Sequence, residues 1–483
     1  MKQVDRFFIP VIIREDSHMD IKVNFSGRAI RYTEEEIAVV VEAMRNADPL
    51  TQGRYMREFE SKFARYQGVA EGSCFTTMNG CAALEMSAQL CRFKPGDELV
   101  IPSHTFTASA YPYQKKGARL VWADVDPLTR VVTAASIEKV LTPSTKAVVV
   151  VHLYGYVADM PAIAALCKER GLILIEDAAQ AIGAEVDGKM AGSFGDMAVF
   201  SFHSHKNLTT LGEGGMLYVR DPALAAVVPA LRHNGHCSYD FERPDYWKPA
   251  MGNVDVPMLD GDMLMPNNYC LGEVECALGA TLLDRIDRIN DEKRARALRF
   301  MDALADFPEL EFHRVDNRRH NYHLLAARMT AGPEMRDRFM RAMSQEKGVK
   351  CVVQYIPLDR YDYYRRLGYG SADCPNADAF FDSMISFPFQ HWLSEEDFKG
   401  ITLIMLNELK DSMAERDIAF TWDDSLVEYL TRKSYSMTYG ARNLRRLIQK
   451  ELEDAIALRL IESYMTPVTA LHASVEQEKI VLS

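Results

Sequence analysis

Between about residues 34 and 260, short and strongly apolar runs alternate with stretches whose apolar residues recur at helical spacing. Runs such as "ELVIP", "AVVVV" and "LILIED" have the length and the branched aliphatic content of strands that are buried on both faces. Segments such as "MPAIAALCKERG" lie between some of them and favour helices. This alternation predicts an α/β fold, in which helices cover both faces of a mostly parallel sheet.

The remainder of the chain divides into two further parts. At 483 residues the chain is too long for one ordinary domain. The stretch 272–304 has the spacing of one long helix, and shorter α and β segments follow it, which favours a smaller α+β domain. From residue 401 the pattern is mainly helical and ends in one or two strands. We therefore expect domains at 1–265, 266–400 and 401–483.

Composition narrows the classes of function. The net charge of −12 argues against a nucleic-acid-binding protein. The nine cysteines include no CxxC pair, which is typical of reduced thiols and predicts no metal site. The N-terminus lacks a signal-peptide layout, and no apolar run is long enough to cross a bilayer. We expect a soluble, cytoplasmic protein without nucleic-acid or membrane partners.

Two of the apolar runs end in polar residues. Asp177 closes "LILIED", and "MAVFSFHSHK" ends in Ser201 through Lys206. Ligands of open α/β sheets bind at the carboxyl ends of strands, so a site is expected here. Taken alone, Lys206 fits a surface lysine. It also fits a partly desolvated amine with a lowered pKa, suited to Schiff-base chemistry.

Asp177 needs a partner if it is buried, because an unpaired buried carboxylate is costly. The pyridinium nitrogen of pyridoxal phosphate is such a partner. Gln180 could then hydrogen-bond the ring oxygen of the same cofactor. The alternative for Asp177 is the N-cap of a helix that begins in "AAQAIG".

Two more segments suit a flat, phosphorylated ligand. "TTMNGCAALEMSAQL" is a loop that opens into a helix, and backbone N–H groups at a helix start bind phosphate. There Gly80 permits close approach and Cys81 follows it, although an ordinary helix start has the same pattern. Phe106 follows "ELVIP" and could stack on a ring, but for an isolated phenylalanine a core position is the commoner alternative.

Together, these segments give the chain a resemblance to a known family. "NGCAALEMSAQL", "PGDELVIPSHTFTASA", "IEDAAQAIGA" and "GSFGDMAVFSFHSHKNLTTLGEGG" occur in the order of the DegT/StrS-type (DegT/DnrJ/EryC1/StrS) sugar aminotransferases. The resemblance spans about residues 9–400. It implies the aspartate-aminotransferase fold (fold type I), pyridoxal 5'-phosphate as cofactor, and an amino-acid donor, with glutamate expected. The acceptor that it implies is a nucleotide-linked keto-sugar, which places the enzyme in polysaccharide biosynthesis.

The resemblance also implies roles for individual residues. At Cys81 the family usually has threonine or serine, and a thiol is a poorer donor, so we expect weaker cofactor retention. The histidines His203 and His205 are expected to be structural or peripheral. The resemblance implies that Lys206 forms the internal aldimine and transfers the proton, that Asp177 pairs with the ring nitrogen of the cofactor, and that Gln180 contacts its ring oxygen. It implies that Ser201, Gly80 and Cys81 hold the phosphate and that Phe106 stacks on the ring. It also implies a homodimer with shared sites, in which Asn268 reaches the phosphate bound by the neighbouring subunit.

Other functions remain open at this point. Some relatives carry a histidine in place of the lysine and act as sugar dehydratases, so the presence of Lys206 favours transamination. A non-enzymatic assembly or adaptor protein is a third possibility.

That third possibility depends on the C-terminal part, which from about residue 401 resembles the C-terminal small domain of Clp-type AAA+ unfoldases. "YGARNLRR" matches the segment with their sensor arginine, here Arg442. No GxxxxGK[ST] motif for ATP phosphates occurs in the chain. We therefore expect an inert or oligomer-forming appendage, with a docking role or an artificial join of two genes as alternatives.

Overall fold

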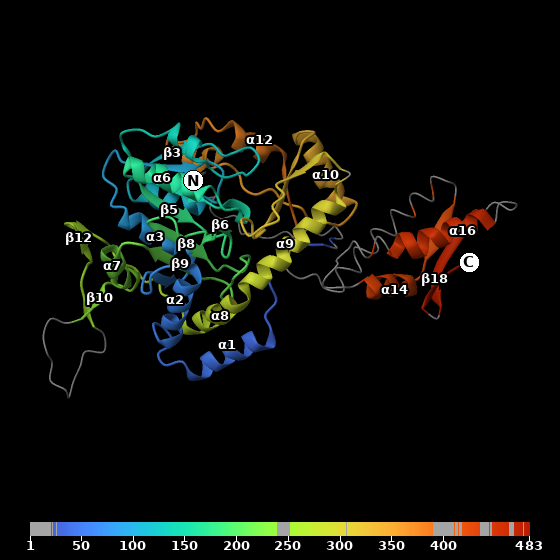
Figure 1. Ribbon diagram of the computed structural model, residues 1–483, viewed down its shortest axis with the longest axis horizontal. Coiled ribbons are helices and arrows are strands. Elements are labelled where there is room, and N and C mark those ends of the chain that lie inside the picture. Colours follow the sequence, from blue (N-terminus) through green and yellow to red (C-terminus); the bar gives the residue numbers. More distant parts are fainter. Residues whose placement is uncertain are drawn as a thin grey trace, which may run out of the picture. The chain divides into compact units, whose positions relative to one another are not determined.

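A computed structural model of the chain describes residues 21–483 except 22, 26, 239–251, 306, 390–409, 411–413, 415–417, 435–443, 445–446, 463–467 and 477. The described residues form two compact units (Figure 1). One unit lies within Ser26–Pro333 and Val353–Trp392, and the other lies within Met1–Phe25, Glu334–Val352 and Leu393–Ser483. The domain boundaries that the sequence suggests stay a prediction.

The first unit is built on a seven-stranded sheet. Six of its strands run in the same direction, while β9 is antiparallel to both of its neighbours. The apolar runs of the sequence form these strands, which confirms the predicted mostly parallel sheet. In their order across the sheet, the strands are β1 (Cys74–Thr77), β9 (Gly215–Val219), β8 (Met197–Ser201), β5 (Ile173–Asp177), β4 (Thr145–Val151), β2 (Glu98–Pro102) and β3 (Arg119–Ala123).

Helices from several parts of the sequence belong to the same unit. The first helix begins at a capping box in which Thr33 and Glu36 each accept the other's backbone N–H. In Figure 1, α1, α2 and α8 lie together, and α8 contacts both of the others. The helices are α1 (Glu34–Asn46), α2 (Arg54–Gln67), α3 (Gly80–Leu90), α4 (Tyr111–Lys115), α5 (Ala134–Glu138), α6 (Met160–Arg170), α7 (Pro222–Arg232), α8 (Glu273–Leu282), α9 (Ile286–Ala303), α11 (Asp362–Arg366) and α12 (Pro375–Ser383).

The single long helix predicted for 272–304 is wrong in one respect. A 3-10 turn at Leu283–Arg285 separates α8 from α9. Most of α8 is buried against the large core, and a Cβ at Gly279 would lie 2.6 Å from the ring of Phe59. Close packing therefore fixes α8 in place, and the chain turns before α9 continues.

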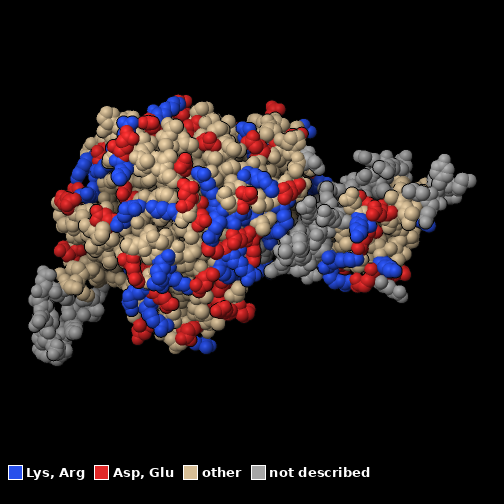
Figure 2. Space-filling view, in the orientation of Figure 1, with Lys and Arg blue, Asp and Glu red and all other residues tan. Residues whose placement is uncertain are grey.

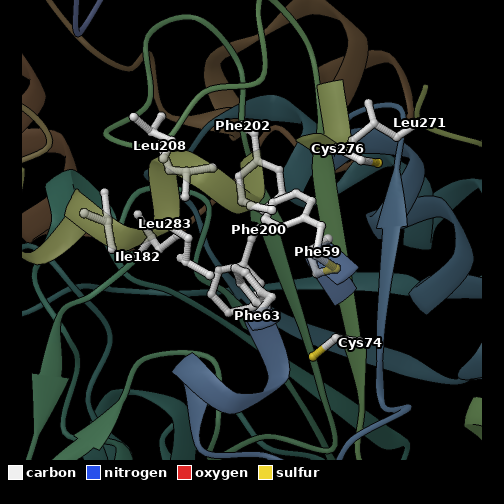
Figure 3. Close-up of a cluster of buried hydrophobic side chains, with 14 of the residues drawn as sticks. Phe59, Phe63, Cys74, Ile182, Phe200, Phe202, Leu208, Leu271, Cys276 and Leu283 are labelled. Carbon is white, nitrogen blue, oxygen red and sulfur yellow. The ribbon is translucent and has the colours of Figure 1, made fainter. Parts of the chain in front are cut away.

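A cluster of aromatic rings joins the helical layer to the sheet (Figure 3). Phe59 and Phe63 come from α2, while Phe200 lies in β8 and Phe202 just after it. The ring centroids of Phe63 and Phe200 are 4.9 Å apart, and those of Phe59 and Phe202 are 5.4 Å apart. Edge-on and tilted packing of this kind is favourable for aromatic pairs. The cluster therefore anchors the end of β8, directly before the segment that carries Lys206.

Replacement of Phe63 by alanine should lower the free energy of unfolding by about 3–5 kcal/mol, because it leaves a cavity beneath β8. Thermal unfolding of the full chain, followed by circular dichroism, measures the effect as a lower midpoint. Phe307→Ala is the control, since Phe307 is exposed. Equal midpoints for the two variants would show that the cluster does not stabilise the sheet.

A smaller antiparallel sheet completes the first unit. Its strands are β14 (Leu310–Phe312), β15 (Leu325–Met329) and β16 (Met384–Phe387), and α12 contacts β15. This sheet agrees with the α and β segments expected before residue 400. Three two-stranded hairpins lie in the same unit: β6 (Glu185–Val186) with β7 (Lys189–Met190), β10 (His236–Cys237) with β11 (Asn253–Val254), and β12 (Met258–Leu259) with β13 (Asp262–Met263).

The second unit contains the C-terminal part of the chain. Its strand β18 (Ala470–Glu476) pairs with β17 (Ala419–Trp422) in parallel and with β19 (Lys479–Leu482) in antiparallel orientation. The two final strands confirm the prediction, but β17 lies where helix was expected. The sequence-matched Arg442 lies outside the described residues. The described helices of the unit are α10 (Pro333–Gln345), α14 (Asp424–Ser434), a π-helix at Ile448–Glu453 and α16 (Asp454–Glu462).

Charges of the two signs are mixed on the face of the protein that Figure 2 shows. On the face in Figure 2, lysine and arginine side chains are interspersed with aspartate and glutamate among the described residues. No described helix has the length and apolar character needed to span a bilayer. Within the described part of the chain, no three His, Cys, Asp or Glu side chains are grouped as metal ligands.

Candidate active site

Asp177 is the last residue of β5 and lies between the ends of β4 and β8. Its carboxylate is buried, with 5 % of the residue exposed. Oδ2 accepts a hydrogen bond of 2.6 Å from Ser109 Oγ, and Oδ1 accepts one of 3.1 Å from the N–H of Ala179. Residues 178–183 form turns, so the alternative of a helix N-cap is wrong. The side chain is held firmly at the carboxyl end of the sheet.

The neighbouring Glu176 has a different function. Its carboxylate accepts the backbone N–H groups of Gly192, Phe194 and Gly195 at 2.6–2.8 Å. Its Oε2 also lies 2.9 Å from His152 Nε2. These bonds fix the loop before β8, so Glu176 is a structural anchor and Asp177 is the carboxylate that is left for the site.

Lys206 lies in the turn after β8, where its N–H donates to the carbonyl of His203 at 2.8 Å. Burial lowers the pKa of Lys206 to about 8, while the nearby Asp177 and Cys81 act to raise it. The structure thus brings these three side chains into one electrostatic group. An amine with this pKa is neutral far more often at neutral pH than an ordinary lysine.

The start of α3 packs tightly against the ends of β8 and β9. Asn79 caps this helix by accepting the N–H of Ala82 at 2.9 Å. A Cβ at Gly80 would lie 3.1 Å from Ser201 Cβ, and one at Gly215 would lie 2.7 Å from Gly80 N. A side chain at Gly215 would clash with backbone atoms, and one at Gly80 would need Ser201 to shift by a few tenths of an ångström. The N–H groups of the first helical turn have no partners within the helix, so this corner suits an anion.

The side chain of Cys81 is turned toward a different neighbour. Its thiol shares a hydrogen bond with Tyr111, and burial raises the pKa of Cys81. Cys81 is therefore a protonated thiol at neutral pH. It carries no negative charge that would repel an anion bound at this corner.

Tyr355 contacts both Phe106 and Gln180, and these three residues form one wall of the site, the active-site wall. Phe106 is not a core residue, because 49 % of it is exposed, and its ring centroid lies 5.7 Å from that of Tyr355. Gln180 Nε2 donates to Tyr355 Oη at 3.2 Å, and Gln180 Oε1 accepts from the N–H of Tyr154 at 2.6 Å. Burial raises the pKa of Tyr355 to about 12.

Sequence reasoning missed both Tyr355 and a buried lysine behind the site. Lys293 Nζ donates to Asn207 Oδ1 and to the carbonyl of His323, both at 3.0 Å. Burial lowers the pKa of Lys293 to about 7. Because Asn207 follows Lys206 directly, Lys293 supports the backbone that carries the site lysine. Its sequence context, "NDEKRARALRF", has the appearance of an exposed helix face.

The remaining candidates lie at the edge of this group. The ring centroids of His203 and His205 are 4.9 Å apart, and His203 Nε2 lies 3.9 Å from a carboxylate oxygen of Glu213. Asn268 is exposed, pairs with His233 through an isolated bridge, and accepts the N–H of Cys270 at 3.3 Å. These described contacts of Asn268 do not include Lys206 or Asp177 of its own chain.

Residues 31–405 match the model of the DegT/DnrJ/EryC1/StrS aminotransferase family. The chain belongs to this family. The family depends on pyridoxal phosphate, so the predictions of a sugar aminotransferase, its fold class and its cofactor are confirmed. Residues 393–473 of this aminotransferase match the C-terminal D2-small domain of ClpB, which confirms the second resemblance.

The aminotransferase is similar to several characterised proteins over most of its length. It is 32% identical over 373 residues to the spore coat polysaccharide biosynthesis protein SpsC of Bacillus subtilis, covering 76% of this chain and 92% of SpsC. It is 31% identical over 358 residues to a UDP-N-acetyl-3-dehydro-alpha-D-glucosamine 3-aminotransferase of Acidithiobacillus ferrooxidans, covering 74% and 89%. The solved structure of the aminotransferase TlmJ from Streptoalloteichus hindustanus matches with a TM-score of 0.69 and 30% identity, covering 81% and 99%.

Proposed function

We propose that this aminotransferase transfers an amino group from glutamate to a keto-sugar attached to a nucleotide. The observation that carries the proposal is the pairing of a half-buried amine of lowered pKa, Lys206, with a buried carboxylate, Asp177, beside the start of α3. The similarity to an aminotransferase named for a UDP-linked dehydro-sugar supports the acceptor class.

The residues present fit pyridoxal phosphate. The corner formed by Gly80, Gly215 and Ser201 is closely packed, since a Cβ at Gly215 would clash with the backbone, and it offers a helix start to a phosphate. Asp177 would pair with the protonated ring nitrogen, Gln180 would contact the ring oxygen, and Phe106 would lie against the ring. When bound, the cofactor supplies an aldehyde carbon that carries the amino group and a ring that takes up electrons.

The protein's own groups position and move protons. Lys206 Nζ is the base of this site, since its lowered pKa leaves it able to accept a proton near neutral pH. Ser109 and the N–H of Ala179 fix the position of the Asp177 carboxylate, because both donate a hydrogen bond to it. Tyr154 and Tyr355 fix the amide of Gln180 from two sides.

We also propose a homodimer in which Asn268 serves the site of the partner subunit. The exposure of Asn268 leaves its amide available to a second chain. The ClpB-like segment has no part in this chemistry. It closes a hydrophobic core of its own around Phe420, Leu430 and Leu452, which supports its interpretation as an inert or oligomer-forming appendage.

The test of the proposed function is an assay of the full chain with glutamate against a panel of nucleotide-linked keto-sugars. Formation of 2-oxoglutarate together with an aminated sugar is the expected result. Turnover of the sugar without consumption of glutamate would instead indicate a dehydratase, and no turnover with any acceptor would reject the proposed substrate class.

The pKa of Lys206 gives a prediction that does not depend on turnover. In cofactor-free protein, acetylation of Lys206, quantified by peptide mass spectrometry, should rise with pH around a midpoint of about 8, because only the neutral amine reacts. In Asp177→Asn the midpoint should fall, since the Asp177 carboxylate raises the pKa of Lys206. A midpoint near 10.5, the ordinary value for lysine, would contradict the lowered pKa of Lys206.

A further inference from the structure

A cavity behind the active-site wall contains a buried cation with unused hydrogen-bond donors. Its empty volume is about 390 Å³, including its opening, and little of that space is wider than a water-sized group. Aromatic and aliphatic residues, Thr129 and Arg130 line it. The aromatic lining residues are Tyr154, Tyr156, His313, His320, Tyr322 and Phe380.

Arg130 is 4 % exposed, and only part of its guanidinium is paired. Nη2 donates to Glu311 Oε1 at 3.0 Å, while Nε and Nη1 are buried without a hydrogen-bond partner. The guanidinium carbon lies 4.4 Å above the ring of Phe380. Buried N–H groups of a charged side chain are costly when they lack an acceptor, so an acceptor is expected beside them.

The charge balance around Arg130 points the same way. Glu311 is shared, because Arg328 Nη2 also donates to its Oε2 at 2.9 Å. Two guanidinium groups thus face one carboxylate. Asp126 offsets the excess positive charge only from a distance, because its Oδ1 accepts the backbone N–H groups of Leu128 and Thr129. One positive charge in this cluster is left without a bonded counter-charge.

The histidines of the cavity do not add to that charge. Burial lowers the pKa of His313 to about 4 and the pKa of His320 further below its ordinary value. Both rings are therefore neutral at neutral pH. Arg130 is the cation that lines the cavity, and the rings around it restrict a ligand to a few atoms.

Backbone conformation marks the same place. Arg130, Tyr154 and Tyr322 have φ angles of +65°, +60° and +49°. Bulky residues rarely adopt this region, and such strain gathers at ligand sites. Tyr154 also connects the cavity to the active site, since its N–H holds Gln180 and its hydroxyl donates to the carbonyl of Gln354.

We propose that this cavity is a binding site for a small singly charged anion of the size of chloride or formate, held by Arg130 Nε and Nη1. The sharing of Glu311 by two arginines and the narrow, ring-lined space carry the proposal. The anion site is independent of the substrate proposed above, because Arg130, Glu311 and Arg328 have no role in the proposed amino transfer.

Crystals of the full chain soaked in sodium bromide test the site directly. An anomalous bromide peak within hydrogen-bond distance of Arg130 Nη1 is the expected result. A water molecule there without any bromide, or an empty cavity, would overturn the proposal. This measurement uses the unaltered protein, so it does not depend on whether a variant folds.

Thermal unfolding gives a second test. Sodium chloride or formate should raise the midpoint of the full chain by about 2 °C or more above sodium gluconate at equal ionic strength, with saturation. Arg130→Met should lose this difference. The control is Arg360→Met, since Arg360 is paired with Asp378 and Asp382 and should leave the response intact. An equal response in chloride and gluconate, or an unchanged response in Arg130→Met, would reject the site.

Discussion

Replacement of Lys206 by alanine is expected to lower kcat by at least about 10⁴-fold, because under the proposed function the variant lacks both the amine that would hold the cofactor and the base that would move the proton. No other described amine can take over. Lys293 is buried behind Asn207, where its Nζ is engaged by two acceptors. Glutamate-dependent formation of 2-oxoglutarate measures the loss.

Two further observations make this prediction specific to chemistry. After borohydride reduction, the mass of the cofactor should appear on the peptide with Lys206 in the unaltered protein, and on no peptide of the variant. His205→Ala is the matched control, since His205 is adjacent but exposed, and its activity should stay within a few-fold. Full activity of Lys206→Ala would refute the assigned role, and a lowered unfolding midpoint would point to a structural effect instead.

Much of the large sheet could be predicted from sequence because its strands are buried on both faces. Such strands appear as uninterrupted apolar runs, and "LILIED" and "AVVVV" form β5 and β4 as expected. Burial of a carboxylate at the end of β5 also followed from that pattern. The break at Leu283–Arg285 did not, because the helical spacing of apolar residues continues through it.

The parts of the site that were missed depend on tertiary contacts. Tyr355 reaches Gln180 from 175 positions further along the chain, in a segment with no local motif. Lys293 is fully enclosed by the fold, although its neighbours in sequence are charged. The strand β17 was missed for a similar reason, since "AFTW" is short and pairs with β18, about fifty residues away. Local patterns carry no information about partners at such separations.

Replacement of Asp177 by asparagine should lower kcat by about 10²–10³-fold while the fold is retained. Asparagine keeps an oxygen for the N–H of Ala179 and a group for the Ser109 hydroxyl, so the local bonds survive. What it removes is the negative charge that, under the proposed function, would lie opposite the cofactor ring. A ring that no longer stays protonated is a weaker electron acceptor, so the rate of proton removal falls more than substrate binding does.

Ser109→Ala separates the charge of Asp177 from its position. This variant removes the 2.6 Å hydrogen bond to Oδ2 but retains the carboxyl group of Asp177. If charge dominates, Ser109→Ala should lose much less activity than Asp177→Asn, and only Asp177→Asn should change the visible absorption of the bound cofactor. Equal losses in the two variants would mean that the hydrogen-bonded position of the carboxylate matters more than its charge. Wild-type kcat in Asp177→Asn would remove Asp177 from the catalytic group altogether.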